Sequence, residues 1–440
     1  MSNYVPNTEE QQKEMLQAIG LGSMEDLFAA VPEDVRIKDA LRLPEGLSEM
    51  DVLRQMEEMA GKNTVFRSVF RGAGAYRHFI PAMVESVLSN ETLQTAYTPY
   101  QAEISQGVLQ SIFEYQTGIC ELTGMDVSNA SVYDGATAAA EAVAMCVDKK
   151  RKKALVSSCT QPQVIDTIRT YCFGNETALE LIPEKNGVTD LDALREMIDD
   201  DTACVYIQNP NFYGTIEDGQ AIGEIIAQTK AKYIMGVNPI SLGLLKTPAE
   251  YGADIAVGEG QPLGLPLSFG GPYIGFMATT DAMKRKLPGR IVGKTIDVDG
   301  KEGYVLTLQA REQHIRREKA SSNICSNQAL CALAVGVYLA SMGPEGLREA
   351  AIQSASAAHY MAQQLKDLGF EICYTGDETD FFNEFVTLSA GDPDRILKAL
   401  EEHGILGGLD LGEGRILWCC TEMNRKADID EAVEIIKEVL

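Results

Sequence analysis

The sequence predicts an α/β fold built on a doubly wound, mostly parallel sheet. The main observation is a regular alternation of short β-rich runs and helical runs between residues 154 and 260. Such alternation is typical of βαβ units, whose crossovers make the strands parallel and place helices on both faces of the sheet. The β-rich runs are residues 154–158, 178–183, 203–210, 232–239 and 254–260, and the helical runs between them are residues 162–175, 191–200 and 219–230.

Three regions of different character divide the chain. Residues 1–65 are rich in Glu, Gln, Leu and Met, with proline punctuation, and predict short helices that form an N-terminal arm. Residues 66–320 form the expected large α/β domain, which also contains two strongly helical stretches at 103–124 and 135–147. Residues 321–440 alternate helices with strands and predict a small C-terminal α+β domain.

Charge and composition exclude several classes of function. The formal net charge of −26 opposes binding to nucleic acid or to an anionic membrane. The ten cysteines contain no C-x-x-C pair, and the first residues lack the pattern of a secretory signal, so we expect a cytoplasmic protein. No metal site is expected, because the four histidines are scattered; they are His78, His314, His359 and His403.

Three further stretches have plain structural interpretations. Residues 134–142 place small residues at a helix start, where free backbone amides could bind a phosphate. Asp134 stands at the N-cap position and its carboxylate would compete for those amides, so a self-capped helix is at least as good an interpretation. Residues 289–295 have one residue too few between their glycines for a nucleotide-binding P-loop. The basic run at 149–153 is expected to be a solvated surface.

The stretch from Tyr97 to Gly107 is unusual, because two tyrosines, a proline and a carboxylate precede a long helix. These side chains either line a pocket or form a rigid, packed helix entry. The residues alone leave both interpretations open.

Long strings of the sequence resemble the P-protein of the glycine cleavage system, glycine dehydrogenase (decarboxylating). The resemblance is carried by residues 95–142, 208–214, 258–278 and 311–330, and it extends over essentially all 440 residues. Within that family the chain is most similar to subunit 1 of the two-chain form, the N-terminal type.

The resemblance implies a fold-type-I pyridoxal-phosphate enzyme that decarboxylates glycine and passes the aminomethyl group to the lipoyl arm of the H-protein. The T-protein and L-protein complete that cycle with tetrahydrofolate and NAD. The implied assembly is a heterotetramer with two copies each of this chain and of glycine dehydrogenase subunit 2.

This sequence departs from the family pattern at the cofactor. In the cofactor-bearing subunit, a His-Lys pair follows the strand equivalent to residues 252–260, and its lysine forms the Schiff base. Here Gln261 and Pro262 occupy those positions, and proline has no amine. Asn238 similarly replaces the acid expected to pair with the pyridine nitrogen. We therefore expect no catalytic residue on this chain, inactivity of the chain alone, and pyridoxal phosphate held covalently by the partner subunit.

What the chain contributes is expected to be a set of residues that complete the partner's pocket. By the resemblance, and by their place before a helix, the candidates for substrate binding are Tyr97, Thr98, Tyr100, Gln101 and Glu103. One alternative is a purely structural subunit that supports the cofactor-bearing chain and receives the H-protein. Another is an independent enzyme that uses a different lysine, such as Lys246 or Lys294.

Overall fold

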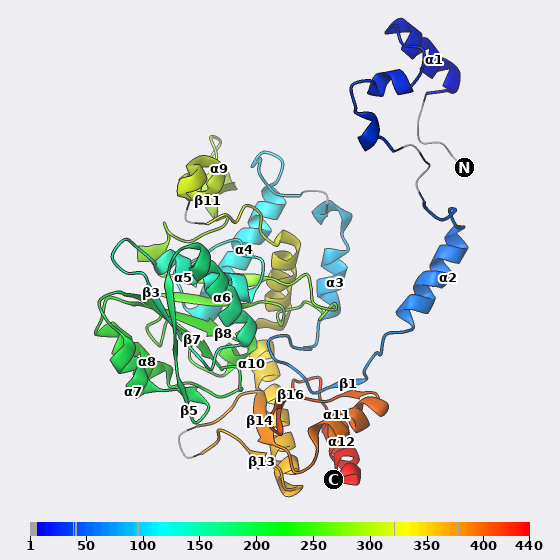
Figure 1. Cartoon of the computed structure of the whole chain (residues 1–440). Helices are drawn as coiled ribbons and strands as arrows, with labels where there is room; N and C mark the ends of the chain where they lie inside the picture. The colour runs from blue at the N-terminus through cyan, green and yellow to red at the C-terminus, as the bar shows by residue number, and fades with distance from the viewer. Residues whose placement is uncertain (1–6, 38, 40–41, 95–96, 321, 377–378) are drawn as a thin grey trace. The chain divides into compact units, whose positions relative to one another are not determined.

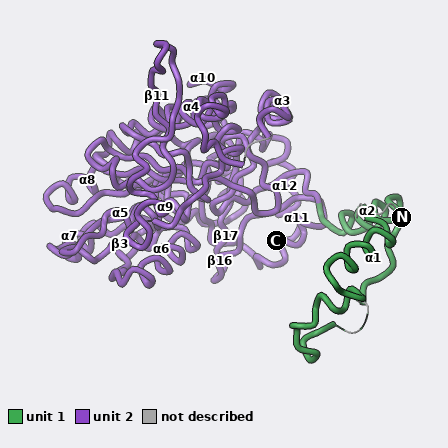
Figure 2. The backbone as a smooth tube through the Cα atoms, turned by 90° about the horizontal axis from the view of Figure 1, so that it is seen from above, with its two compact units in different colours: residues 1–64 green, residues 65–440 purple. Residues whose placement is uncertain are grey.

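The computed structural model describes residues 7–37, 39, 42–94, 97–320, 322–376 and 379–440. The chain forms two compact units, residues 1–64 and residues 65–440, which Figure 2 shows in green and purple. The further division expected near residue 320 stays a prediction.

The first unit is a set of short helices. Thr8 and Ser48 cap its two α-helices, and each side chain accepts a hydrogen bond from a backbone N–H three residues later. Among the described residues of this unit only Leu16 is buried, so the unit has little core of its own. Its elements are α1 (Glu9–Ala18), η1 (Glu25–Phe28), η2 (Glu33–Val35) and α2 (Glu49–Ala60).

A seven-stranded sheet is the centre of the second unit. Its order is β2-β10-β9-β8-β7-β3-β4. Strands β9, β8, β7, β3 and β4 are parallel, whereas β10 runs antiparallel to both β9 and β2. The mostly parallel sheet predicted from the sequence is thus confirmed. The strands are β2 (Val127–Ser128), β3 (Lys153–Ser157), β4 (Ala178–Ile182), β7 (Thr202–Asn209), β8 (Lys232–Val237), β9 (Ile255–Glu259) and β10 (Gly275–Thr279).

Both faces of the sheet are covered, as a near-continuous apolar pattern requires. Leu155 of β3 belongs to the core under α4, α7, α8 and α10, whereas its neighbours Ala154 and Val156 belong to the core under α5 and α6 (Figure 1). The helices over the two faces are α4 (Gln106–Thr123), α5 (Gly135–Cys146), α6 (Pro162–Gly174), α7 (Leu191–Met197), α8 (Gly219–Ala227) and α10 (Ala329–Asp367).

Helix α4 ends as expected and starts later than expected. Gly124 is in the left-handed conformation that closes a helix, with φ of 73°. The helix begins at Gln106, not near Glu103, because residues 101–104 form a turn in which Ile104 N–H donates to the Gln101 carbonyl.

The C-terminal residues build a second, antiparallel sheet of order β13-β14-β17-β16. Its core contains the fully buried Trp418, whose Nε1 donates to Thr387 Oγ1 over 2.9 Å. The strands and the helices packed on them are β13 (Glu371–Ile372), β14 (Glu384–Leu388), β16 (Leu409–Gly412), β17 (Arg415–Cys419), α11 (Pro393–Glu402) and α12 (Lys426–Val439).

Helix α10 joins the two sheets and is bent. Its 39 residues are long and apolar enough to cross a membrane, by length and composition alone. However, Gly343 has non-helical torsions and is followed by Pro344, and Ala332, Val335 and Tyr338 on the first half are buried in the core. The helix is therefore a two-segment core element.

Shorter elements connect these parts. The first residues of the second unit return to the C-terminal region, because β1 (Ser68–Val69) pairs in parallel with β15 (Ile405–Leu406). The others are α3 (Ala82–Leu88), η3 (Glu91–Leu93), β5 (Glu184–Lys185), β6 (Val188–Thr189), η4 (Pro239–Gly243), η5 (Asp281–Met283), β11 (Val292–Ile296), β12 (Glu302–Leu306), η6 (Gln309–Arg311), α9 (Gln313–Arg316) and η7 (Arg317–Lys319).

Truncating a buried side chain of β3 should destabilise the second unit. Leu155 is fully buried, so Leu155→Ala leaves a cavity and should lower the free energy of unfolding by about 2–5 kcal/mol. Urea denaturation followed by tryptophan fluorescence measures this effect. Phe173→Ala, at a side chain that is 88% exposed, is the control and should change stability little. Equal effects of the two substitutions would contradict the assignment of Leu155 to the core.

Candidate functional site

A cavity of about 240 Å³ lies at the carboxyl ends of the parallel strands, where α/β sheets bind ligands. The last residues of β7, β8 and β9 line it, together with residues that follow β3, β8 and β9 and the start of α5. No lysine or arginine is among the described residues that line it. They are Gly74, Tyr76, Asp134, Gly135, Ala136, Gln161, Gln163, Val164, Tyr206, Gln208, Gly236, Val237, Asn238, Pro239, Gly258, Glu259, Pro262 and Tyr273.

The carboxylate of Glu259 closes the N-terminus of α5 inside this cavity. One oxygen accepts a hydrogen bond from Gly135 N–H at 2.9 Å. The other accepts from the backbone N–H groups of Gln261 and Ile274, at 2.9 and 3.1 Å. Burial raises the pKa of Glu259 to about 7, although these three donors favour the ionised form.

Asp134 occupies the remaining part of the helix start. Its Oδ1 accepts from Thr137 N–H at 2.7 Å, so of the two alternatives that the sequence allows, the self-capped helix is the one observed. Two protein carboxylates thus take the amides that would otherwise bind a phosphate. A Cβ on Gly135 would lie 2.8 Å from Glu259 N, so the contact also requires glycine.

The side chains of Gln261 and Asn238 form hydrogen bonds with the backbone around the cavity. The fully buried Gln261 side chain accepts from Tyr76 N–H and donates to the carbonyls of Tyr76 and Leu265, at 2.9, 2.9 and 2.7 Å. Asn238 Oδ1 accepts from Ile240 N–H at 3.0 Å and caps η4. Pro262 lines the cavity beside them. The side-chain amides of Gln261 and Asn238 therefore have a structural role.

Residues 73–76 lie across the cavity and are fastened at three points. Gln261 holds Tyr76, Gln161 Nε2 donates to the Ala73 carbonyl at 2.8 Å, and Glu384 accepts from Ala73 N–H at 2.6 Å. The Tyr76 hydroxyl donates to the second oxygen of Glu384 at 2.7 Å. Burial raises the pKa of Glu384 to about 7. This network keeps the segment in place over the strand ends.

These residues do not fit a covalently held pyridoxal phosphate. Pro262, where the resemblance places the lysine, has no amine; two carboxylates hold the helix start, and the cavity lining has no cation among its described residues. A phosphate placed here would meet like charge at short range.

The five substrate-binding candidates lie elsewhere, in the loop before α4, and none of them lines the cavity. Tyr97 is 83% exposed and its hydroxyl lies 3.3 Å from Ser326 Oγ. Tyr100 is 51% exposed, with its ring 5.0 Å from the Arg290 guanidinium. Thr98 Oγ1 is buried and has no hydrogen-bond partner among the described residues. Gln101 and Glu103 are exposed.

A buried ion pair supports this loop. Arg290 Nη1 lies 2.8 Å from Glu312 Oε2, and both side chains are less than a tenth exposed. Arg290 Nε also donates to the Cys325 carbonyl at 3.1 Å. The sequence analysis missed this pair; because 22 positions separate the two residues, their contact has no local signal.

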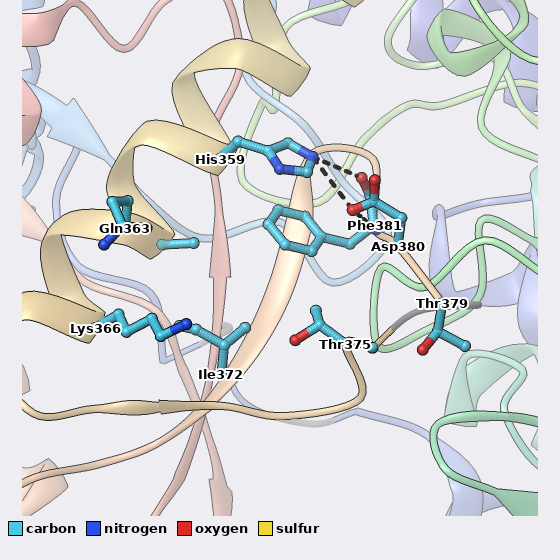
Figure 3. Close-up of a pocket in the computed structure, with 10 residues that line it drawn as sticks. His359, Gln363, Lys366, Ile372, Thr375, Thr379, Asp380 and Phe381 are labelled. Carbon is cyan, nitrogen blue, oxygen red and sulfur yellow. Dashed lines mark hydrogen bonds and ion pairs between the residues drawn. The ribbon is translucent and has the colours of Figure 1, made fainter.

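A larger, open hollow of about 550 Å³ lies beside the second half of α10 (Figure 3). Its His359 ring stacks on Phe381 with centroids 4.1 Å apart, and His359 Nε2 lies 3.0 Å from the Phe381 carbonyl and 3.6 Å from Asp380 Oδ1. These contacts are structural, and none of the candidates from the sequence lies here.

Among the described residues no group of three His, Cys, Asp or Glu side chains could hold a metal ion.

Known structures share this fold. A crystal structure of glycine decarboxylase (P-protein) of the glycine cleavage system, in inhibitor-bound form, matches with a TM-score of 0.91 and 43% identity over 100% of both chains. A C-DES mutant with glycine covalently linked to its PLP cofactor matches with a TM-score of 0.63 and 13% identity, over 88% of this chain and 99% of that one. The second likeness shows the fold alone, that of the fold-type-I pyridoxal-phosphate enzymes.

Known sequences agree along nearly the whole chain. The family model described as glycine cleavage system P-protein matches residues 2–436. The probable glycine dehydrogenase (decarboxylating) subunit 1 of Desulfitobacterium hafniense is 49% identical over 447 residues, covering 99% of this chain and 100% of that protein. The protein of the same description from Carboxydothermus hydrogenoformans is 48% identical over 442 residues, covering 98% and 99%. The chain belongs to the glycine cleavage system P-protein family, as a chain of its subunit 1 type.

Proposed function

We propose that this chain is the subunit of a heteromeric glycine decarboxylase that lacks a cofactor of its own. With subunit 2 it decarboxylates glycine through pyridoxal phosphate, and the complex transfers the aminomethyl group to the lipoyl arm of the H-protein. The observation that carries the proposal is a chain matching P-proteins over nearly its full length, whose strand-end cavity has Pro262 and Glu259 where a cofactor site needs a lysine and free amides.

The cofactor then belongs to the partner. We expect two copies of each chain, with pyridoxal phosphate held covalently by subunit 2. The residues around this chain's own cavity have a structural role: Glu259, Gln261 and Glu384 hold the strand ends and residues 73–76 in one arrangement. We assign no step of the reaction to this cavity.

The loop at residues 97–103 is the contribution we assign to glycine binding in the partner's pocket. It presents the exposed phenol rings of Tyr97 and Tyr100 on a backbone that leads directly into helix α4. The guanidinium of Arg290 packs on the face of the Tyr100 ring. An exposed aromatic side chain with a polar tip suits an interface where a small polar substrate must be enclosed. Among the described residues, the Tyr100 hydroxyl has no hydrogen-bond partner, so it is available to a ligand.

A second candidate function is that of a structural subunit which docks the H-protein and supports subunit 2 without contacting glycine. It is favoured by the distance in the fold between the loop and this chain's own cavity, since none of the five candidates lines that cavity. The substitution at Tyr100 distinguishes the two functions.

Tyr100→Phe removes only the hydroxyl and keeps the ring over Arg290. If that hydroxyl binds substrate in the complex, glycine–bicarbonate carbon exchange with lipoylated H-protein should fall roughly tenfold to a hundredfold, the effect of one lost hydrogen bond to a charged group. Gel filtration should show unchanged assembly with subunit 2.

Tyr251→Phe is the matched control, because Tyr251 also carries a cation over its ring, with Lys246 Nζ 5.9 Å from the centroid. It should leave exchange unchanged. Wild-type activity of Tyr100→Phe would refute a role of the hydroxyl in substrate binding and favour the structural subunit.

Borohydride trapping tests where the cofactor is held. The isolated chain, incubated with pyridoxal phosphate and reduced, should show no stoichiometric adduct by mass spectrometry, because Lys246 lies over Tyr251 and Lys294 pairs with Glu302 at 2.6 Å, both outside the cavity. In the complex the adduct should lie on subunit 2. A stoichiometric adduct at a lysine of this chain would overturn the proposal.

The pH dependence of stability tests the closed helix start. Because the pKa of Glu259 is raised to about 7 in the fold, from about 4.3 in an unfolded chain, the folded state binds the extra proton. The contribution of Glu259 to the free energy of unfolding should therefore be fully present below about pH 4.3 and be lost as the pH rises through 7, with a slope from this group of at most about 1.4 kcal/mol per pH unit.

Glu259→Gln should remove that part of the slope, so the stability difference between wild type and variant should shrink between pH 5 and pH 8. Urea denaturation at each pH measures it, and Glu180→Gln at an exposed position of β4 is the control. Parallel profiles for wild type and Glu259→Gln would contradict the assignment.

A further inference from the structure

Five cationic side chains surround a pocket of about 340 Å³ that lies apart from the strand-end cavity. They come from two segments: the residues just after η5, and the stretch from η6 through α9 to η7, of which α9 is labelled in Figure 1. The remaining lining is Leu308 and Ala310, so no acid lines the pocket among the described residues. The cations are Arg285, Lys286, Arg311, Arg316 and Lys319.

These cations are unusual in a chain with a net charge of −26. None of the five forms an ion pair within the described residues, whereas their neighbours Lys284 and Arg290 are paired with Asp281 and Glu312. Unpaired like charges around one hollow repel each other, and the arrangement is stabilised when an anion enters.

Arg311 shows most directly that an acceptor is missing. One of its terminal nitrogens donates to the Gly289 carbonyl at 2.7 Å, but its Nε is buried and has no hydrogen-bond partner among the described residues. Burial lowers the pKa of Arg311, and the charge of Arg290 acts in the same direction against the attraction of Glu312. A buried N–H without an acceptor costs free energy that a bound anion would recover.

The shape, volume and lining of the pocket indicate which class of anion it binds. It is a single hollow, not the extended basic stripe that nucleic acid needs, and its volume suits a small molecule. Three of the five cations are arginines, whose planar forks match phosphate oxygens in a bidentate manner. We propose that this pocket binds a compact polyanion that carries phosphate groups, such as a diphosphate.

This site is independent of the proposed decarboxylase function. The two sites are nevertheless neighbours: Arg311 precedes Glu312, which pairs with Arg290 under Tyr100, and Arg311 also donates to the Gly289 carbonyl. Arg316→Gln, whose side chain makes none of these contacts, should therefore weaken polyanion binding and leave glycine exchange unchanged, and failure of the exchange test would leave the polyanion test intact.

Isothermal titration calorimetry of the full 440-residue chain with pyrophosphate, at constant ionic strength, tests the proposal. We expect one saturable site with a Kd on the order of 10–100 μM. Arg311→Gln and Arg316→Gln should each weaken binding about tenfold or more, since each removes a charge-assisted contact. Arg316 is exposed, so its variant keeps the test valid if Arg311→Gln fails to fold.

The double variant Lys149→Gln, Lys150→Gln is the matched control. It removes two charges from the basic run at residues 149–153, whose side chains at these positions are exposed, and should leave the Kd unchanged. Equal weakening in the control would show general charge screening and overturn the proposal. The absence of saturable pyrophosphate binding would overturn it too, and citrate binding as tight as pyrophosphate would overturn the assignment to phosphate.

Discussion

The buried carboxylate of Glu259 is the contact on which the arrangement of the strand ends depends. It accepts hydrogen bonds from three backbone N–H groups, which belong to the start of α5, to the turn after β9 and to the residue just before β10. One side chain thus joins three segments that are separated along the chain. Hydrogen bonds to a charged acceptor are worth about 1.5–3 kcal/mol each, which offsets part of the cost of burying the carboxylate; burial still raises the pKa of Glu259.

The same contact decides what the cavity can hold. In an α/β sheet the helix start beyond a strand end is a natural anion site, because its amides are free and its dipole is positive. Here Glu259 and Asp134 accept hydrogen bonds from those amides. The side-chain amide of Gln261 is hydrogen-bonded to the backbone of residues 76 and 265. In this chain the strand ends are therefore held together by protein side chains, which supports our proposal that the cofactor belongs to a second subunit.

One buried ion pair underlies both exposed features to which we assign binding. Arg290 lies under the ring of Tyr100 and pairs with Glu312, and Glu312 follows Arg311 of the basic pocket. The loop at residues 97–103 and the basic pocket are therefore built on neighbouring parts of the structure. We propose different ligands for them because Tyr100 offers a phenol at an open surface, whereas Arg311 offers an unpaired Nε–H in a hollow lined by cations.

The sequence by itself determined the mostly parallel sheet and the helices on its two faces, because both follow from the periodicity of neighbouring residues. The absence of a lysine at Pro262 came from the resemblance to the family, and the N-cap at Asp134 was one of two alternatives until the structure decided between them. The sequence placed the start of α4 three residues too early, since the turn at residues 101–104 depends on one local hydrogen bond that competes with the helix. Only the tertiary structure decided that Glu259 meets Gly135, 124 positions away, that Gln261 meets Tyr76, 185 positions away, and that the basic residues gather around one pocket. Such contacts are set by how the strands order in the sheet, and no pattern of neighbouring residues records that order.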